Sequence, residues 1–124
     1  MVSSSVYSLP GIKVHNYNEH DLIKDVCDYF KITPEQIKTK IRTYNLVRPR
    51  QICMHFLLEK FPQYTFSSIG FMMGGFNHAT VCHSRNVVLN DMKTNTAFRE
   101  MVDDIRSIID SHILDVNETK IQSI

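Results

Sequence analysis

The apolar residues of this chain recur at helical spacing over most of its length. In the first segment Leu22, Val26 and Phe30 share one face, and Asn18 precedes them as a candidate N-cap. The clearest stripe comes last, in a helix predicted to start near Asn95 and to carry Phe98, Met101, Val102, Ile105, Ile108, Ile109, His112 and Ile113. Such a stripe is typical of a helix that packs against a core.

Two further helix starts are marked by proline. Thr33 and Pro34, with Gln36 placed to complete a capping box, predict a short helix that ends near Arg42. The stretch TYNLV interrupts the helical pattern. Pro49 then marks the start of a third helix that ends before the next proline. The expected core stripe of this helix is Ile52, Cys53, Phe56 and Leu57.

A pair of glycines separates the next two helices. Thr65 can cap a short helix, FSSIGFMM, and Asn77 can cap a fifth one. Gly74 and Gly75 between them allow the backbone angles of a sharp turn. The expected buried stripe of the fifth helix is Val81, Val88, Leu89 and Met92. Because no long alternating pattern occurs, we predict an all-α bundle of about six helices.

Length and composition fit one domain. A chain of 124 residues has room for a single core, and we expect a flexible arm over 1–17, a helical domain over 18–115 and a tail over 116–124. The N-terminus lacks the pattern of a signal peptide, and no apolar run is long enough to cross a membrane. Three cysteines, far apart and odd in number, favour buried reduced thiols. These features predict a cytoplasmic protein.

The basic residues concentrate in the middle of the chain. The formal net charge is only +1, yet residues 31–60 contain seven Lys and Arg against two acids, with no acid between Lys38 and Arg50. A polyanion is the expected partner of such a stretch, and a solvated surface without a partner is the alternative.

A short helix, a glycine turn and a longer helix also have the proportions of a helix-turn-helix, whose second helix enters the DNA major groove. In that geometry Asn77, His78, Ala79 and Thr80 lead into the groove. His78 and Cys82 have a spacing that can supply two zinc ligands, but no second pair completes a site. No phosphate-binding loop ending in Gly-Lys-Ser/Thr occurs, and no acid, base and nucleophile converge. We expect no metal, cofactor, small-molecule substrate or enzymatic activity.

Two separated stretches carry a family resemblance. TKIRTYNLVRPRQICMHFLLEKF and SSIGFMMGGFNHATVCHS join an Arg-Pro-Arg-Gln helix start to a Gly-Gly-x-x-His-x-Thr-Val-x-His turn. Over about residues 20–112 the chain resembles the C-terminal DNA-binding domain of the bacterial chromosomal replication initiator DnaA. The resemblance implies a Trp-repressor-like helical bundle that binds double-stranded DNA in replication initiation or its regulation.

The resemblance also assigns roles to residues. Arg42 takes the minor-groove role of the family's basic loop, and residues 77–80 read bases in the major groove. The expected DNA-binding set is Lys38, Lys40, Arg42, Arg48, Arg50, Gln51, Gly75, Asn77, His78, Ala79, Thr80 and Ser84. Phe76, Asn77 and Ala79 depart from the family, which usually has a basic residue, an Asp and a hydroxyl residue there. A changed base preference is therefore expected.

Two functions follow as alternatives. Without an ATPase, a DNA-binding chain would mark or occupy sites as a regulator, competitor or recruiter, in a cell, phage or mobile element, and would associate with the nucleoid. The alternative is a protein-interaction module that lost DNA binding and contacts a replication protein or a second copy. An exposed Phe76 favours that module, and a continuous basic face joining Arg42 and Arg50 to the start of the fifth helix favours DNA.

Overall fold

The computed structural model describes the backbone of residues 16–122 and the side chains of residues 16–114. The described residues form six helices and no strand: α1 (Glu19–Phe30), α2 (Pro34–Ile37), α3 (Tyr44–Lys60), α4 (Phe66–Met72), α5 (His78–Thr94) and α6 (Thr96–Gln122). The predicted all-α fold is confirmed. The expected arm lies outside the described residues, apart from its last two positions.

The chain divides into two compact units. One unit is Asn18–Ile109, which contains α1 to α5 and the first part of α6, and the other contains α6 from Asp110 onward. Helix α6 continues past Asp115 to Gln122, where a tail was expected. The boundaries at 18 and 115 stay a prediction.

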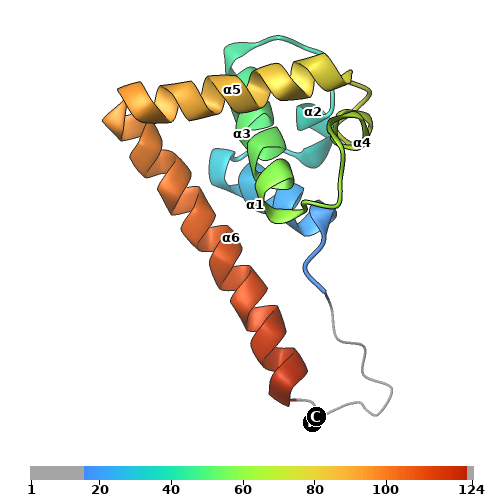
Figure 1. Ribbon diagram of the computed structural model, residues 1–124, viewed down its shortest axis with the longest axis vertical. Helices are drawn as coiled ribbons and strands as arrows, with labels where there is room; N and C mark the ends of the chain where they lie inside the picture. Colours follow the sequence, from blue (N-terminus) through green and yellow to red (C-terminus); the bar gives the residue numbers. More distant parts are fainter. Residues whose placement is uncertain (1–15, 123–124) are drawn as a thin grey trace. The chain divides into compact units, whose positions relative to one another are not determined.

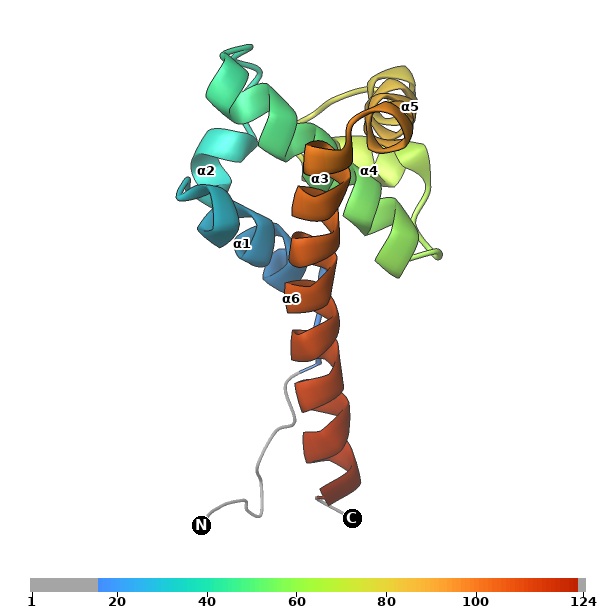
Figure 2. The same cartoon turned by 90° about the vertical axis from the view of Figure 1, so that its left-hand side faces the viewer.

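Helix α3 lies between α1 and α5 within the larger unit (Figures 1 and 2). It packs against α1, α2, α4 and α5, so its buried side chains come from most of its circumference. The core of this unit is apolar, and its most completely buried large side chains are Leu22, Ile23, Ile37, Ile52, Met54, Phe56, Leu57, Ile69, Met73, Ile105 and Ile109. Burial of this kind supplies most of the stability of a small helical domain.

Short-range capping signals set three of the helix starts as predicted. Asn18 Oδ1 accepts from the Asp21 amide at 3.1 Å, and the Asp21 carboxylate accepts from the Asn18 amide at 2.8 Å. Thr33 forms the same reciprocal box with Gln36, and Thr65 forms one with Ser68. Each box satisfies two backbone N–H groups that the first helical turn leaves without partners.

The segment between α2 and α3 differs from the prediction. Helix α2 ends at Ile37 and not near Arg42, and α3 begins at Tyr44, so Pro49 lies inside the helix and does not open it. Leu46, 7% exposed, anchors the first turn of α3 in the core. This burial offsets the one helical hydrogen bond that Pro49 cannot donate.

The buried stripe of α5 is also corrected. Val81 and Val88 are buried as expected, but Leu89 is 40% exposed and Ser84 is buried between the two valines. The stripe of α3 and the pairing of Ile69 with Met73 on one face of α4 are confirmed, since all of these side chains are fully buried.

The three cysteines are free thiols, as predicted. Cys27 and Cys53 are buried, whereas Cys82 is only half-buried. Burial raises the pKa of the Cys27 thiol to about 11 and raises that of Cys53 well above its usual value. Both groups therefore stay neutral at physiological pH.

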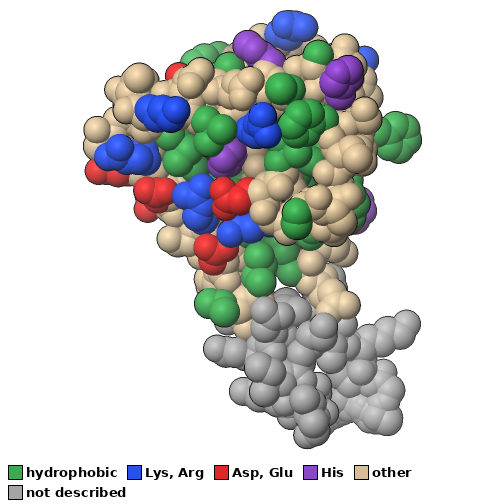
Figure 3. Space-filling view, in the orientation of Figure 1, with side chains coloured by type: hydrophobic (Ala, Val, Ile, Leu, Met, Phe, Trp, Pro, Cys, Tyr) green, Lys and Arg blue, Asp and Glu red, His purple; other side chains and the backbone are tan. Residues whose placement is uncertain are grey.

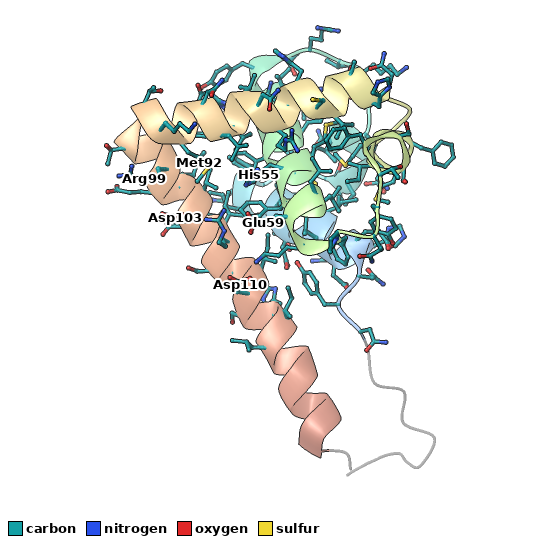
Figure 4. The ribbon with its side chains drawn as sticks, in the orientation of Figure 1. His55, Glu59, Met92, Arg99, Asp103 and Asp110 are labelled. Carbon is teal, nitrogen blue, oxygen red and sulfur yellow. The ribbon has the colours of Figure 1, made fainter. Side chains whose placement is uncertain are left out.

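An ion-pair cluster fastens α6 to α3. Arg106 donates to both carboxylate oxygens of Glu59, at 2.9 and 3.0 Å, and to Asp103 at 2.8 Å. Its guanidinium also lies 5.3 Å from the ring centroid of Phe56. On the face drawn in Figure 3, acidic and basic side chains lie side by side over this region, and Figure 4 shows Glu59 on α3 and Asp103 on α6.

The pKa of the Glu59 carboxyl is held well below its usual value. The neighbouring His55 ring and the Arg106 guanidinium both lower this pKa, while burial opposes them. His55 Nε2 stands 3.5 Å from Glu59, which is long for a hydrogen bond, and both ring nitrogens lack a hydrogen-bonding partner. The bidentate Arg106 contact is therefore the firmer cause.

This cluster predicts a pH-dependent stability. Because its folded pKa is depressed, Glu59 stabilises the protein above its unfolded pKa of about 4.3, and that contribution is lost as pH falls below this value. Glu59→Gln should lower the free energy of unfolding at pH 7 by about 1–2 kcal/mol, and the difference from the unchanged protein should shrink by pH 3. Urea unfolding at both pH values measures this.

Asp104, an exposed acid on α6, supplies the matched control. Asp104→Asn should leave stability nearly unchanged at both pH values. An equal loss for Glu59→Gln at pH 7 and pH 3 would contradict the assigned role of the Glu59 charge.

Candidate nucleic-acid interface

The glycine turn joins α4 to α5 in a closed backbone arrangement. The amides of Gly75 and Phe76 both donate to the Gly70 carbonyl, at 3.0 and 2.9 Å. A side chain on Gly70 would overlap the carbonyl of Phe76, so the two segments meet backbone to backbone. Helices α4 and α5 pack directly on each other, which is the arrangement of a helix-turn-helix.

The turn also lies against the loop that links α2 to α3. Gly74 has φ +111°, and a side chain there would overlap the carbonyl of Lys38. Lys40 Nζ lies 5.9 Å from the ring centroid of Phe76, just after the glycines. We call this combined region, which carries Lys38, Lys40, Arg42, Gly75, Asn77, His78 and Ala79, the turn–loop surface.

Phe76 is covered on this surface and is not an exposed tip. Its ring is half-buried, with the Arg50 guanidinium 5.1 Å and the Lys40 ammonium 5.9 Å from its centroid. Among the described residues the most exposed aromatic side chains are instead Phe71 on α4, 82% exposed, and Tyr44 at the start of α3, 87% exposed. Phe76 therefore joins the basic loop to the turn.

Arg50 does not occupy the position expected for a phosphate contact. Its side chain is 5% exposed and donates to the carbonyls of Ile37 at 2.9 Å, Thr39 at 2.6 Å and Ile41 at 3.2 Å. Burial lowers the pKa of the guanidinium, and the charge of Arg42 lowers it further. These three bonds hold the loop in a non-helical path, which explains the early end of α2.

Arg48 is half-buried and has partners within the fold, and Ser84 is buried. Arg48 pairs with Asp91 of α5 at 2.8 Å and stacks 4.4 Å from the ring centroid of Phe98 in α6. It thus lines a cavity of about 510 Å³ near the start of α3, together with Tyr44. Ser84 is 4% exposed, because it faces the core from α5.

The remaining expected residues are more accessible. Lys40 and Arg42 are exposed on the loop, and Lys38 is half-buried there. Gly75 is exposed, with φ +92° and Lys40 Nζ 4.0 Å from where a side chain would begin. Gln51 is half-buried on α3.

Asn77 caps α5 at the edge of the turn–loop surface. Its Oδ1 accepts from the Thr80 amide at 2.9 Å and from the Thr80 hydroxyl at 3.0 Å. Asn77, His78 and Ala79 are exposed, and Thr80 is half-buried. The predicted cap is confirmed, and the first turn of α5 presents its side chains to solvent.

Arg85 is a basic residue that the sequence reasoning did not select. It stacks 5.0 Å from the ring centroid of Phe66 at the start of α4, and its Nε is buried without a hydrogen-bonding partner. It follows His78 by seven residues, or about two helical turns, so helical spacing would have placed it on the same side of α5.

Within residues 16–114 no three His, Cys, Asp or Glu side chains come together as a metal site. Among the helices that the structure describes, none is long and apolar enough to cross a membrane.

The sequence of this chain is similar to those of known proteins. Residues 20–88 match the family model of the bacterial dnaA protein helix-turn-helix. Among curated relatives named chromosomal replication initiator protein DnaA, that of Porphyromonas gingivalis is 41% identical over 80 residues, covering 64% of this chain and 17% of its own. That of Bacteroides thetaiotaomicron is 32% identical over 100 residues, covering 77% and 21%. The chain thus spans about a fifth of the length of these relatives.

Proposed function

This chain belongs to the bacterial DnaA helix-turn-helix family, and from that premise we propose that it binds double-stranded DNA, with a sequence preference, in replication initiation or its regulation. The proposal places the chain in the cytoplasm, at the nucleoid. It includes no ATPase or other catalytic activity.

One observation carries this proposal: the contact of Gly74 with the Lys38 carbonyl, which joins a basic loop to a helix-turn-helix. Lys40 and Arg42 on the loop are suited to phosphates or the minor groove, because their exposed side chains carry positive charge. Residues 77–80 begin α5, the helix that would enter the major groove. One protein face thus offers contacts that position the duplex and contacts that specify its sequence.

The binding test uses fluorescence anisotropy with two labelled duplexes, one carrying a DnaA box and one scrambled. We expect salt-sensitive binding to both and tighter binding to one of them, because phosphate contacts release counterions and base contacts discriminate. Lys40→Ala should weaken both complexes about equally, whereas His78→Ala should chiefly reduce the difference between them.

If His78→Ala lowered the affinity for both duplexes equally, His78 would not be a base-reading residue. Absence of binding at low salt would overturn the proposal. The alternative, a protein-interaction module, would then lead, with the 82% exposed Phe71 as the observation in its favour.

A further inference from the structure

The hydrogen bonds of Asn77 fix which end of its amide is available. A backbone N–H can only donate, so the Asn77 atom that faces the Thr80 amide at 2.9 Å must be the oxygen, Oδ1. The Thr80 hydroxyl, 3.0 Å away, donates its hydrogen to the same oxygen. Nδ2 therefore remains as the unused group of Asn77, and it makes no hydrogen bond within the described residues.

The N-cap hydrogen bonds leave the Asn77 side chain able only to donate to a partner. Its side chain is exposed at the start of α5, and the oxygen is already occupied twice. A partner meeting this side chain finds two N–H donors and no free carbonyl. Thr80 has the opposite polarity, because its hydrogen is used and only its lone pairs remain.

The bases differ in how they meet a donor. In the major groove guanine offers N7 and O6, adenine offers N7 and thymine offers O4 as acceptors, whereas cytosine offers only the N4 donor. An Asp at this position would offer only acceptors and would suit cytosine. From these hydrogen bonds we infer that Asn77 makes this chain reject cytosine at the base that it meets and accept guanine, adenine or thymine there. This inference rests on the proposed DNA binding.

Asn77→Asp tests the inference because it changes only the amide nitrogen of the side chain. The substitution keeps Oδ1 as the cap and replaces Nδ2 by an oxygen, and Asp caps helices about as well as Asn. The substrates are duplexes in which each base pair of a DnaA box is replaced in turn by the other three. At one position the unchanged protein should bind the cytosine duplex about tenfold more weakly than the best duplex, and Asn77→Asp should make cytosine the preferred base there.

Asn90→Asp is the matched control, since Asn90 is exposed on the same helix. Within each variant the added negative charge should weaken the complexes with all bases by a similar factor, so the order of bases at each position is the readout. An unchanged order for Asn77→Asp at every position would overturn this inference and leave DNA binding standing. No binding of the unchanged protein to any duplex would overturn the proposed function and this inference together.

Discussion

Replacing Arg50 by Met is expected to lower the free energy of unfolding by about 2–4 kcal/mol and to weaken binding to every DNA duplex. The buried guanidinium satisfies the carbonyls of Ile37, Thr39 and Ile41, and Met supplies no donor to any of them. The loop would lose the bonds that set its path. Weaker DNA binding follows indirectly, because Lys40 and Arg42 would lose their fixed positions.

Arg42→Met is the matched control for this prediction. Arg42 carries the same charge and lies on the loop that Arg50 holds, but its side chain is exposed. Its loss should leave stability nearly unchanged and should reduce the salt dependence of DNA binding by about one phosphate contact. Urea unfolding and anisotropy on the same preparations separate the two effects.

Arg50→Lys tests whether the shape of the guanidinium, and not only its charge, is required. Lysine keeps the charge, but its single ammonium cannot reproduce the planar fork that reaches the three carbonyls. We expect Arg50→Lys to be destabilised nearly as much as Arg50→Met. Full stability of either variant would contradict the structural role of Arg50.

Arg50 also explains why the end of α2 differs from the prediction made from the sequence. Helix starts at Asn18, Thr33 and Thr65 were predictable, because each cap and its partner lie three residues apart. The end of α2 was not predictable, because it depends on bonds from Arg50, on the next helix, to the Ile37 carbonyl and its neighbours. Tertiary contacts of this kind override local propensity.

Some features of the candidate site follow from local sequence, and others depend on tertiary packing. The cap at Asn77 and the exposure of the residues after it follow from local sequence. Burial of Ser84 and the pairing of Arg48 with Asp91 depend on how whole helices pack. Position near a motif in the sequence therefore does not predict which partner a basic or polar side chain has within the fold.

The two glycines of the turn should differ sharply when each is replaced by alanine. Both have positive φ, +111° at Gly74 and +92° at Gly75, and this alone costs an alanine about 1–2 kcal/mol. At Gly74 the new methyl group also overlaps the Lys38 carbonyl, which must move. We expect Gly74→Ala to cost about 3 kcal/mol or more and Gly75→Ala about 1–2 kcal/mol.

The two variants should also differ in how their DNA affinity relates to their stability. Gly75 is exposed, and an alanine there would stand 4.0 Å from Lys40 Nζ without touching the loop backbone. Gly75→Ala should therefore remain folded at 25 °C, and any loss of DNA affinity would report a close approach of DNA to the turn. Gly74→Ala instead separates the turn from the loop, so its loss of affinity should follow its loss of structure. Equal stabilities of the two variants in urea would show that the Lys38 carbonyl yields freely, and the loop and turn would then be independent elements.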